Sequence, residues 1–178
     1  MNKLYALIIV VIVSISFSAV RVQRNDNEGR LRFSSGELHH LKTNSESIVR
    51  SYLYSILDIL GHENAHNFPL DYFKEGGINT RHFSFQQEYK GVPVFGRYIR
   101  VHINGDIITS ISSNIDNFDL SIVPLITESG AMDVIRPICI STFTYLQYKN
   151  LQIYIQDDIP YLVHTIDVVS FEDPWRYL

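Results

Sequence analysis

The sequence predicts an α+β protein made of two small modules, each with a helix packed on an antiparallel β-sheet. Residues 43–60 carry apolar side chains at three- and four-residue intervals, which is the periodicity of an amphipathic helix. Residues 82–113 follow with alternating apolar and polar side chains and short turn sequences, as in an antiparallel sheet. Residues 127–171 repeat the order of helix and strands more loosely. Segregated helices and antiparallel strands define the α+β class.

The first 18 residues have the pattern of a secretory signal peptide. Lys3 supplies the positive start, residues 4–13 are apolar, and Ser16 and Ser18 are small residues where a signal peptidase cleaves. The alternative is an uncleaved membrane anchor, but the apolar run is shorter than the roughly 20 residues that span a bilayer. We therefore expect residues 1–18 to be removed and the protein to be secreted.

Composition excludes some classes of partner. The chain has 15 basic and 19 acidic residues and a formal charge of −4, so nothing favours nucleic acid or an anionic membrane. Cys139 is the only cysteine and lies between apolar neighbours, so we expect it to be buried and inert. Residues 19–40 are polar, charged and rich in turn formers, and we predict a flexible lead-in there with His39 and His40 solvated.

The first helix has predicted start and stop signals. Thr43 and Glu46 form a capping box, and Gly61 stands where a helix ends in a left-handed residue. The apolar stripe between them consists of Ile48, Val49, Tyr52, Leu53, Ile56, Leu57 and Leu60.

The sequence HENAH follows this helix at residues 62–66. His-Glu-x-x-His is the zinc-peptidase motif, in which two histidines on one helix face bind zinc and the glutamate is the general base. Here the helix is predicted to end before His62, which puts His62, Glu63 and His66 in a loop, and no third ligand follows at the expected spacing. A zinc enzyme built on these residues is the least favoured function.

The middle of the chain reads as a three-stranded meander. Phe83, Phe85, Gln87 and Tyr89 alternate with polar residues in the first strand. Lys90-Gly91 is a turn, residues 92–103 form a long strand interrupted by Pro93 and Gly96, and Asn104-Gly105 is a strong hairpin signal before the strand at 107–113.

The second half begins with a helix predicted from Thr127 to about residue 140, where Pro137 would kink or end it. Its inward residues would be Ala131, Val134, Ile135 and Ile138. Strands at 151–155 and 161–171 flank a turn that contains Asp157 and Asp158, for which turn geometry is a better explanation than a calcium or acid–base role.

One stretch carries more information than these patterns. Residues 81–96 read RHFSFQQEYKGVPVFG, and residues 100–114 read RVHINGDIITSISSN. This resembles the FTP domain, the fungalysin/thermolysin propeptide motif: an aromatic strand ending in Gln, then Tyr-x-Gly-Val-Pro-Val-Phe-Gly, a strand with a histidine, and a returning strand. The matching residues are Phe85, Gln87, Tyr89, Gly91, Val92, Pro93, Val94, Phe95, Gly96 and His102.

The second half is similar to the PepSY-type module that follows FTP domains in such propeptides. The helix after Thr127, the strand around PYLVHTIDV at 160–168 and the segment PWRY at 174–177 carry this resemblance, and Pro137 departs from it. The resemblance divides the chain into an FTP domain at 41–118 and a PepSY-like module at 119–178, which would be truncated before its last strand.

Together these resemblances imply the propeptide region of a secreted thermolysin-like zinc metallopeptidase. Such a region assists folding of the catalytic domain and inhibits it until cleavage, is not itself an enzyme, and needs no cofactor. The zinc would belong to the catalytic domain, which we expect to lie outside this chain, and not to HENAH. The implied partner is that domain, in cis or in trans. The alternative is a stand-alone secreted inhibitor or binding protein acting in trans.

Overall fold

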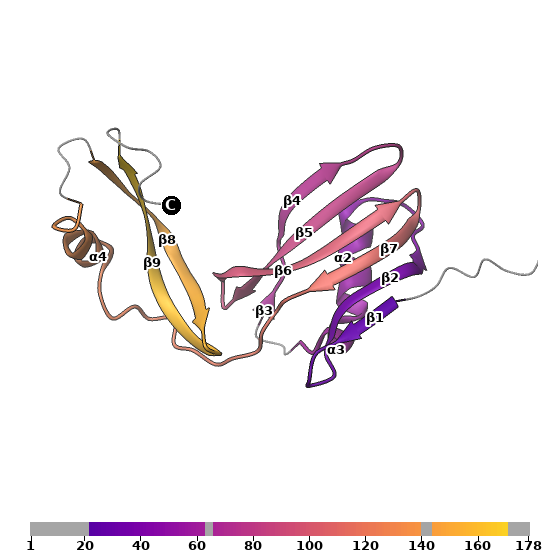
Figure 1. The fold of residues 1–178 in the computed structure, drawn as a ribbon, viewed down its shortest axis with the longest axis horizontal. Coiled ribbons are helices and arrows are strands. Elements are labelled where there is room, and N and C mark those ends of the chain that lie inside the picture. The colour runs from indigo at the N-terminus through magenta and orange to yellow at the C-terminus, as the bar shows by residue number, and fades with distance from the viewer. Residues whose placement is uncertain (1–21, 63–65, 140–143, 171–178) are drawn as a thin grey trace, which may run out of the picture.

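The computed structural model describes residues 22–62, 66–139 and 144–170. The expectations for the signal peptide, for Glu63 and for the segment at 174–177 lie outside these residues. The described helices and strands are, in chain order, β1 (Val22–Asn25), β2 (Leu31–His40), α2 (Glu46–Ser55), α3 (Leu57–Leu60), β3 (His66–Asn67), β4 (Leu70–Glu75), β5 (Thr80–Tyr89), β6 (Val92–Asn104), β7 (Ile107–Ser113), α4 (Glu128–Ile135), β8 (Thr144–Gln156) and β9 (Ile159–Ser170) (Figure 1).

A twisted antiparallel sheet forms the larger part of the molecule, in the order β1-β2-β7-β6-β5, with β3 and β4 both pairing with β5. The prediction of a flexible lead-in at 19–40 was wrong for residues 22–25 and 31–40, which form β1 and β2. Leu31 and Ser34 of β2 are buried, and Phe33 pairs with Ser112 of β7. Only one face of β2 meets the core, so its sequence stays polar enough to resemble a linker.

The predicted helix is present but broken, and its cap differs. Ser45, not Thr43, is the N-cap, because the side chain of Asn44 donates to the Gly105 carbonyl (2.6 Å) and keeps this segment extended. The helix is interrupted at Ile56, where the Ser55 hydroxyl bonds to the Tyr52 carbonyl (2.6 Å) and competes with the helical pattern. The predicted end is confirmed, since Gly61 is a left-handed cap with φ 73°.

Gly61 provides a test of this helix end. A Cβ at residue 61 would lie 2.3 Å from Cγ of Arg30, and the backbone there has the positive φ that side chains disfavour. We expect Gly61→Ala to lower the free energy of unfolding by about 1–2 kcal/mol in urea denaturation. Gly77→Ala is the matched control, because Gly77 has open space around its Cα and no positive φ. Equal effects of the two substitutions would contradict this account.

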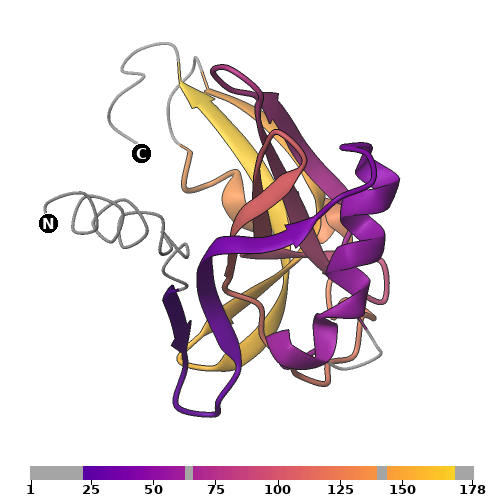
Figure 2. The ribbon, with the colours of Figure 1, turned by 90° about the vertical axis from the view of Figure 1, so that its right-hand side faces the viewer.

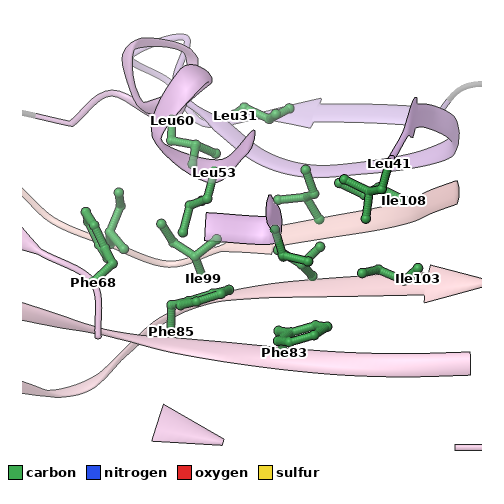
Figure 3. Packing of buried hydrophobic residues seen from close by; sticks show 14 residues of the cluster. Leu31, Leu41, Leu53, Leu60, Phe68, Phe83, Phe85, Ile99, Ile103 and Ile108 are labelled. Carbon is green, nitrogen blue, oxygen red and sulfur yellow. The ribbon is translucent and has the colours of Figure 1, made fainter. Parts of the chain in front are cut away.

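The main core lies between the sheet and the helices α2 and α3, which cover one face of the sheet (Figures 1 and 2). Val49, Leu53 and Leu60 of the predicted stripe are buried in one cluster with strand side chains. Figure 3 shows Leu53 and Leu60 facing the side chains of Phe85 and Ile99. The alternation predicted for β5 is confirmed, since its four core-facing residues are buried: Phe83, Phe85, Gln87 and Tyr89.

The three predicted hairpins are all present, although one of their turns is displaced by one residue. Lys90 and Gly91 both have positive φ (50° and 83°), as do Asp157 and Asp158 (50° and 63°), which suits two-residue turns of the twisted type. In the third hairpin, Asn104 pairs with Ile107 as the last residue of β6, so the loop is Gly105 and the residue after it, one position later than predicted.

The second half holds α4 beside the β8–β9 hairpin, at the far end from β1 (Figure 1). Thr127 caps α4 as predicted, accepting from the Gly130 N–H (3.2 Å), and the helix ends at Ile135, ahead of Pro137. The inward orientation is right for Ala131 but wrong for Val134 and Ile138, which are 61% and 71% exposed. Cys139 is half-buried, not buried as predicted.

The α+β class is confirmed, but the two halves meet closely. Strand β8 bridges to β6 in parallel at Val94 and Ile153. A second buried cluster, Tyr89, Val94 and Ile153, spans both halves. Within the part of the chain that the structure describes, no helix is long and apolar enough to cross a membrane.

Candidate functional site

The ten motif residues predicted from the sequence lie on the hairpin of β5 and β6. The structure divides them by environment: Phe85 enters the main core, Gln87 lies in a buried polar network, and Tyr89 and Val94 belong to the cluster that joins the two halves. Val92 packs against the same cluster, and Gly91, Pro93 and Gly96 lie at turns or bulges. Phe95 is exposed, and His102 lies on the sheet face away from the helices.

Gln87 is fully buried, and its amide binds one residue in two directions. Its Nε2 donates to the Asp116 carbonyl (2.5 Å), while the Asp116 N–H donates to its Oε1 (3.2 Å). The Gln87 side chain thus pairs with the backbone of Asp116, in the segment after β7, as a neighbouring β-strand would. Because Asp116 fixes the amide's orientation, the second Nε2 hydrogen must point elsewhere, and it points to Nδ1 of His66 (2.8 Å).

This contact decides the role of the second histidine of HENAH. Nδ1 of His66 accepts from Gln87, so the ring is neutral with its proton on Nε2. The ring is 8% exposed, and it packs against Tyr89 and Phe118 with centroids 5.0 and 5.1 Å away. The prediction that the helix ends before His62 is confirmed, and His66 lies in the short strand β3. The described part of the segment is built as core, not as the helical face that the zinc motif needs.

Burial and the proximity of His62 lower the pKa of His66 to about 4. Its folded pKa is thus below the unfolded value near 6.5, so the unfolded chain binds the proton more tightly. The stability that neutral His66 contributes to the folded state is therefore fully present above pH 6.5 and is lost as the pH falls towards 4. The pKa of His102 is also lowered, by burial, His82 and Arg100, and acts in the same direction.

We expect the free energy of unfolding to fall on the order of 2–3 kcal/mol from pH 7 to pH 4 through His66. Urea denaturation across this range measures it. His66→Gln should flatten the dependence. His40→Gln should not, because hydrogen bonds from the exposed His40 to Glu37 and Asp106 raise its pKa. A slope unchanged by His66→Gln would refute the assignment.

Tyr89 holds the connection between the halves. Its hydroxyl donates to Oδ1 of Asp119 (2.6 Å) and accepts from the Leu120 N–H (3.4 Å), while Nζ of Lys90 lies 3.4 Å from the same carboxylate. The hydrogen bond from Tyr89 and then the Lys90 charge lower the pKa of Asp119. Asp116 and Asp119 are the acceptors that Gln87 and Tyr89 reach. Their partners lie about 30 positions away, so no local pattern could have identified these roles.

Two motif residues face outward. Phe95 is 57% exposed, with its ring centroid 6.1 Å from that of Tyr154 on β8. His102 pairs across the strands with His82, and their Nδ1 atoms are 2.5 Å apart. Neither side chain is needed by the main core, so both are available at the surface.

An apolar groove of about 820 Å³ lies between α4, the preceding connection and β9. Val123, Leu125 and Val134 line it and are 74%, 103% and 61% exposed. His164 also lines the groove, and its Nε2 lies 2.9 Å from the carbonyl oxygen of Ile126. Exposed apolar side chains gathered in one place are typical of an interaction surface. Sequence reasoning missed this groove because it placed Val134 in the core.

Comparison with protein families gives one match. The profile of the Fungalysin/Thermolysin Propeptide Motif matches residues 77–115, which are the end of the β4–β5 loop and the strands β5, β6 and β7. The resemblance of residues 81–114 is thereby confirmed. The match supports a relation of this part of the chain to the propeptides of thermolysin-like or fungalysin-like proteases.

Proposed function

We propose that this chain is the propeptide region of a secreted thermolysin-like or fungalysin-like zinc metallopeptidase, and that it inhibits the catalytic domain and assists its folding. The observation that carries the proposal is the propeptide motif at 77–115. Its residues also hold the segment that leads into the second half, through hydrogen bonds from Gln87 to Asp116 and from Tyr89 to Asp119. Residues 41–118 would be the FTP domain and 119–178 the PepSY-like module, and residues 1–18 would direct export.

The apolar groove supports this function. An inhibitor must bury surface against its enzyme, and the core of such an interface is apolar. The groove beside β9 offers such a surface, and within the described chain β9 pairs only with β8, so its other edge can accept a strand. The catalytic domain is the partner that fits, whether it is encoded in the same chain or separately.

The test is to titrate the purified chain into a thermolysin-type protease and follow peptide cleavage. We expect dose-dependent inhibition, and Leu125→Asp with Val134→Asp should weaken it, because both residues line the groove. Ile78→Asp is the matched control, since Ile78 is 93% exposed in the β4–β5 loop. Absence of inhibition and of assisted refolding would reject the proposal.

The same samples test the zinc enzyme. Zinc content and hydrolytic activity are measured on the chain alone and on Glu63→Gln. One bound zinc per chain, with activity abolished by Glu63→Gln, would replace the propeptide proposal by an enzyme based on HENAH.

A further inference from the structure

The sheet face away from α2 carries two continuous rows of side chains that run across the strands. The residues between these rows, such as Phe83, Val101 and Ile111, point to the core. The pairing of the strands gives the first row as Tyr72, Ser84, Arg100, Ser112, Phe33 and Arg24. The second row is Lys74, His82, His102, Ser110, Ser35 and Val22. Helix α2 covers only the opposite face of this sheet (Figure 2).

These rows concentrate positive charge. They contain three permanently basic residues and two histidines and no carboxylate, in a chain whose net charge is −4. One acid, Asp71 at the bulge of β4, lines a shallow depression of about 500 Å³ together with Lys74, His82 and Arg100. An uncompensated positive face on an acidic protein attracts negatively charged partners.

The lysine and the two arginines of the rows have no counterion among the described residues. Among the described residues, eight lysines and arginines form ion pairs: Arg30, Arg32, Arg50, Arg81, Lys90, Arg97, Arg136 and Lys149. The other four in that part of the chain form none, and three of these four, Arg24, Lys74 and Arg100, lie on this one face, whereas Lys42 does not. All three are exposed.

The arginines are also held in place. The guanidinium of Arg100 lies over the Tyr98 ring (5.3 Å to the centroid), and that of Arg24 lies over the Phe33 ring (5.9 Å). A guanidinium stacked on a ring keeps its N–H edge free for two parallel hydrogen bonds to a carboxylate. The serines of both rows add hydroxyl donors between the cations.

We propose that these two rows dock a carboxylate-rich protein surface. That the surface belongs to the protease catalytic domain rests on the proposed function, whereas the chemistry of docking does not. A single-stranded nucleic acid fits less well, because the arginines cover the rings of Phe33 and Tyr98 that would stack on bases. The negative charge of the remaining chain also opposes a long polyanion.

The test is fluorescence anisotropy of a fluorescein-labelled octaglutamate peptide titrated with the purified chain at low and physiological salt. We expect binding that weakens with salt and that falls about tenfold or more in Lys74→Ser with Arg100→Ser. The matched control is Lys42→Ser with Arg136→Ser, which removes the same charge from exposed residues outside the rows. This control should retain binding to within about twofold.

Three results would overturn the inference: no binding, equal weakening by both double variants, or tighter binding of a labelled oligothymidylate than of octaglutamate. The protease titration separates it from the proposed function. Inhibition by a chain that does not bind octaglutamate through the rows would leave the function standing and reject the docking face. Row-dependent octaglutamate binding without any inhibition would do the reverse.

Discussion

Replacing Phe85 by alanine is expected to lower the free energy of unfolding by about 3–5 kcal/mol, a large part of the stability of an ordinary domain. Phe85 is fully buried beneath the helices, and its ring is 6.2 Å from that of Phe83 (Figure 3). The Arg50 guanidinium lies 5.6 Å from the centroid of the Phe85 ring. Alanine leaves a cavity that the sheet cannot close. Urea denaturation followed by circular dichroism measures the loss.

Phe95→Ala is the control, because Phe95 belongs to the same motif and is 57% exposed. Its removal should change stability by less than about 0.5 kcal/mol. A loss for Phe95→Ala as large as that for Phe85→Ala would show that the second half depends on the contact between Phe95 and Tyr154 more than the geometry indicates.

Replacing Gln87 by alanine is the second large effect. It removes the partners of His66 Nδ1 and of both backbone groups of Asp116, in a place closed to solvent. Each buried group left without its hydrogen bond costs about 1–3 kcal/mol, so we expect a total loss of about 3–4 kcal/mol. The segment after β7 should also lose protection from hydrogen exchange, because Gln87 holds it against β5.

Gln86→Ala serves as the control, since Gln86 is the adjacent glutamine on the other face of β5 and is only half-buried. Its loss should be below about 1 kcal/mol. Gln87→Glu refines the test: the carboxylate cannot donate to His66 or to the Asp116 carbonyl, but it can pair with a protonated His66. Its deficit relative to the native chain should therefore shrink as the pH falls towards 5, and a deficit that grows would contradict the network.

The residues of the propeptide motif are close together in the sequence but have different roles in the fold. Phe85 stabilises the main core, Gln87 and Tyr89 hold the connection to the second half, and Phe95 and His102 remain at the surface. Only the last two can serve recognition without also serving stability. Interface mutagenesis of this protein should therefore begin with exposed motif residues and with the open sheet face.

Sequence alone was enough to predict four features: the α+β class, the strands β5 to β7, the end of the first helix at Gly61, and the motif that relates this region to protease propeptides. These features depend on local periodicity, turn chemistry and short spacings, which a single chain displays directly. Flexible residues at 22–40 were the main wrong expectation, because a strand with one solvated face and a bulge has the composition of a linker.

The folded chain was needed to show how distant residues act together. It placed His66 beside Gln87, which in turn binds Asp116, brought Tyr89 to Asp119, and aligned the basic side chains of four strands into two rows. Each of these arrangements depends on strand register and on contacts between residues 20 or more positions apart. Such contacts follow from how the whole chain buries its apolar surface, and no local sequence pattern encodes them.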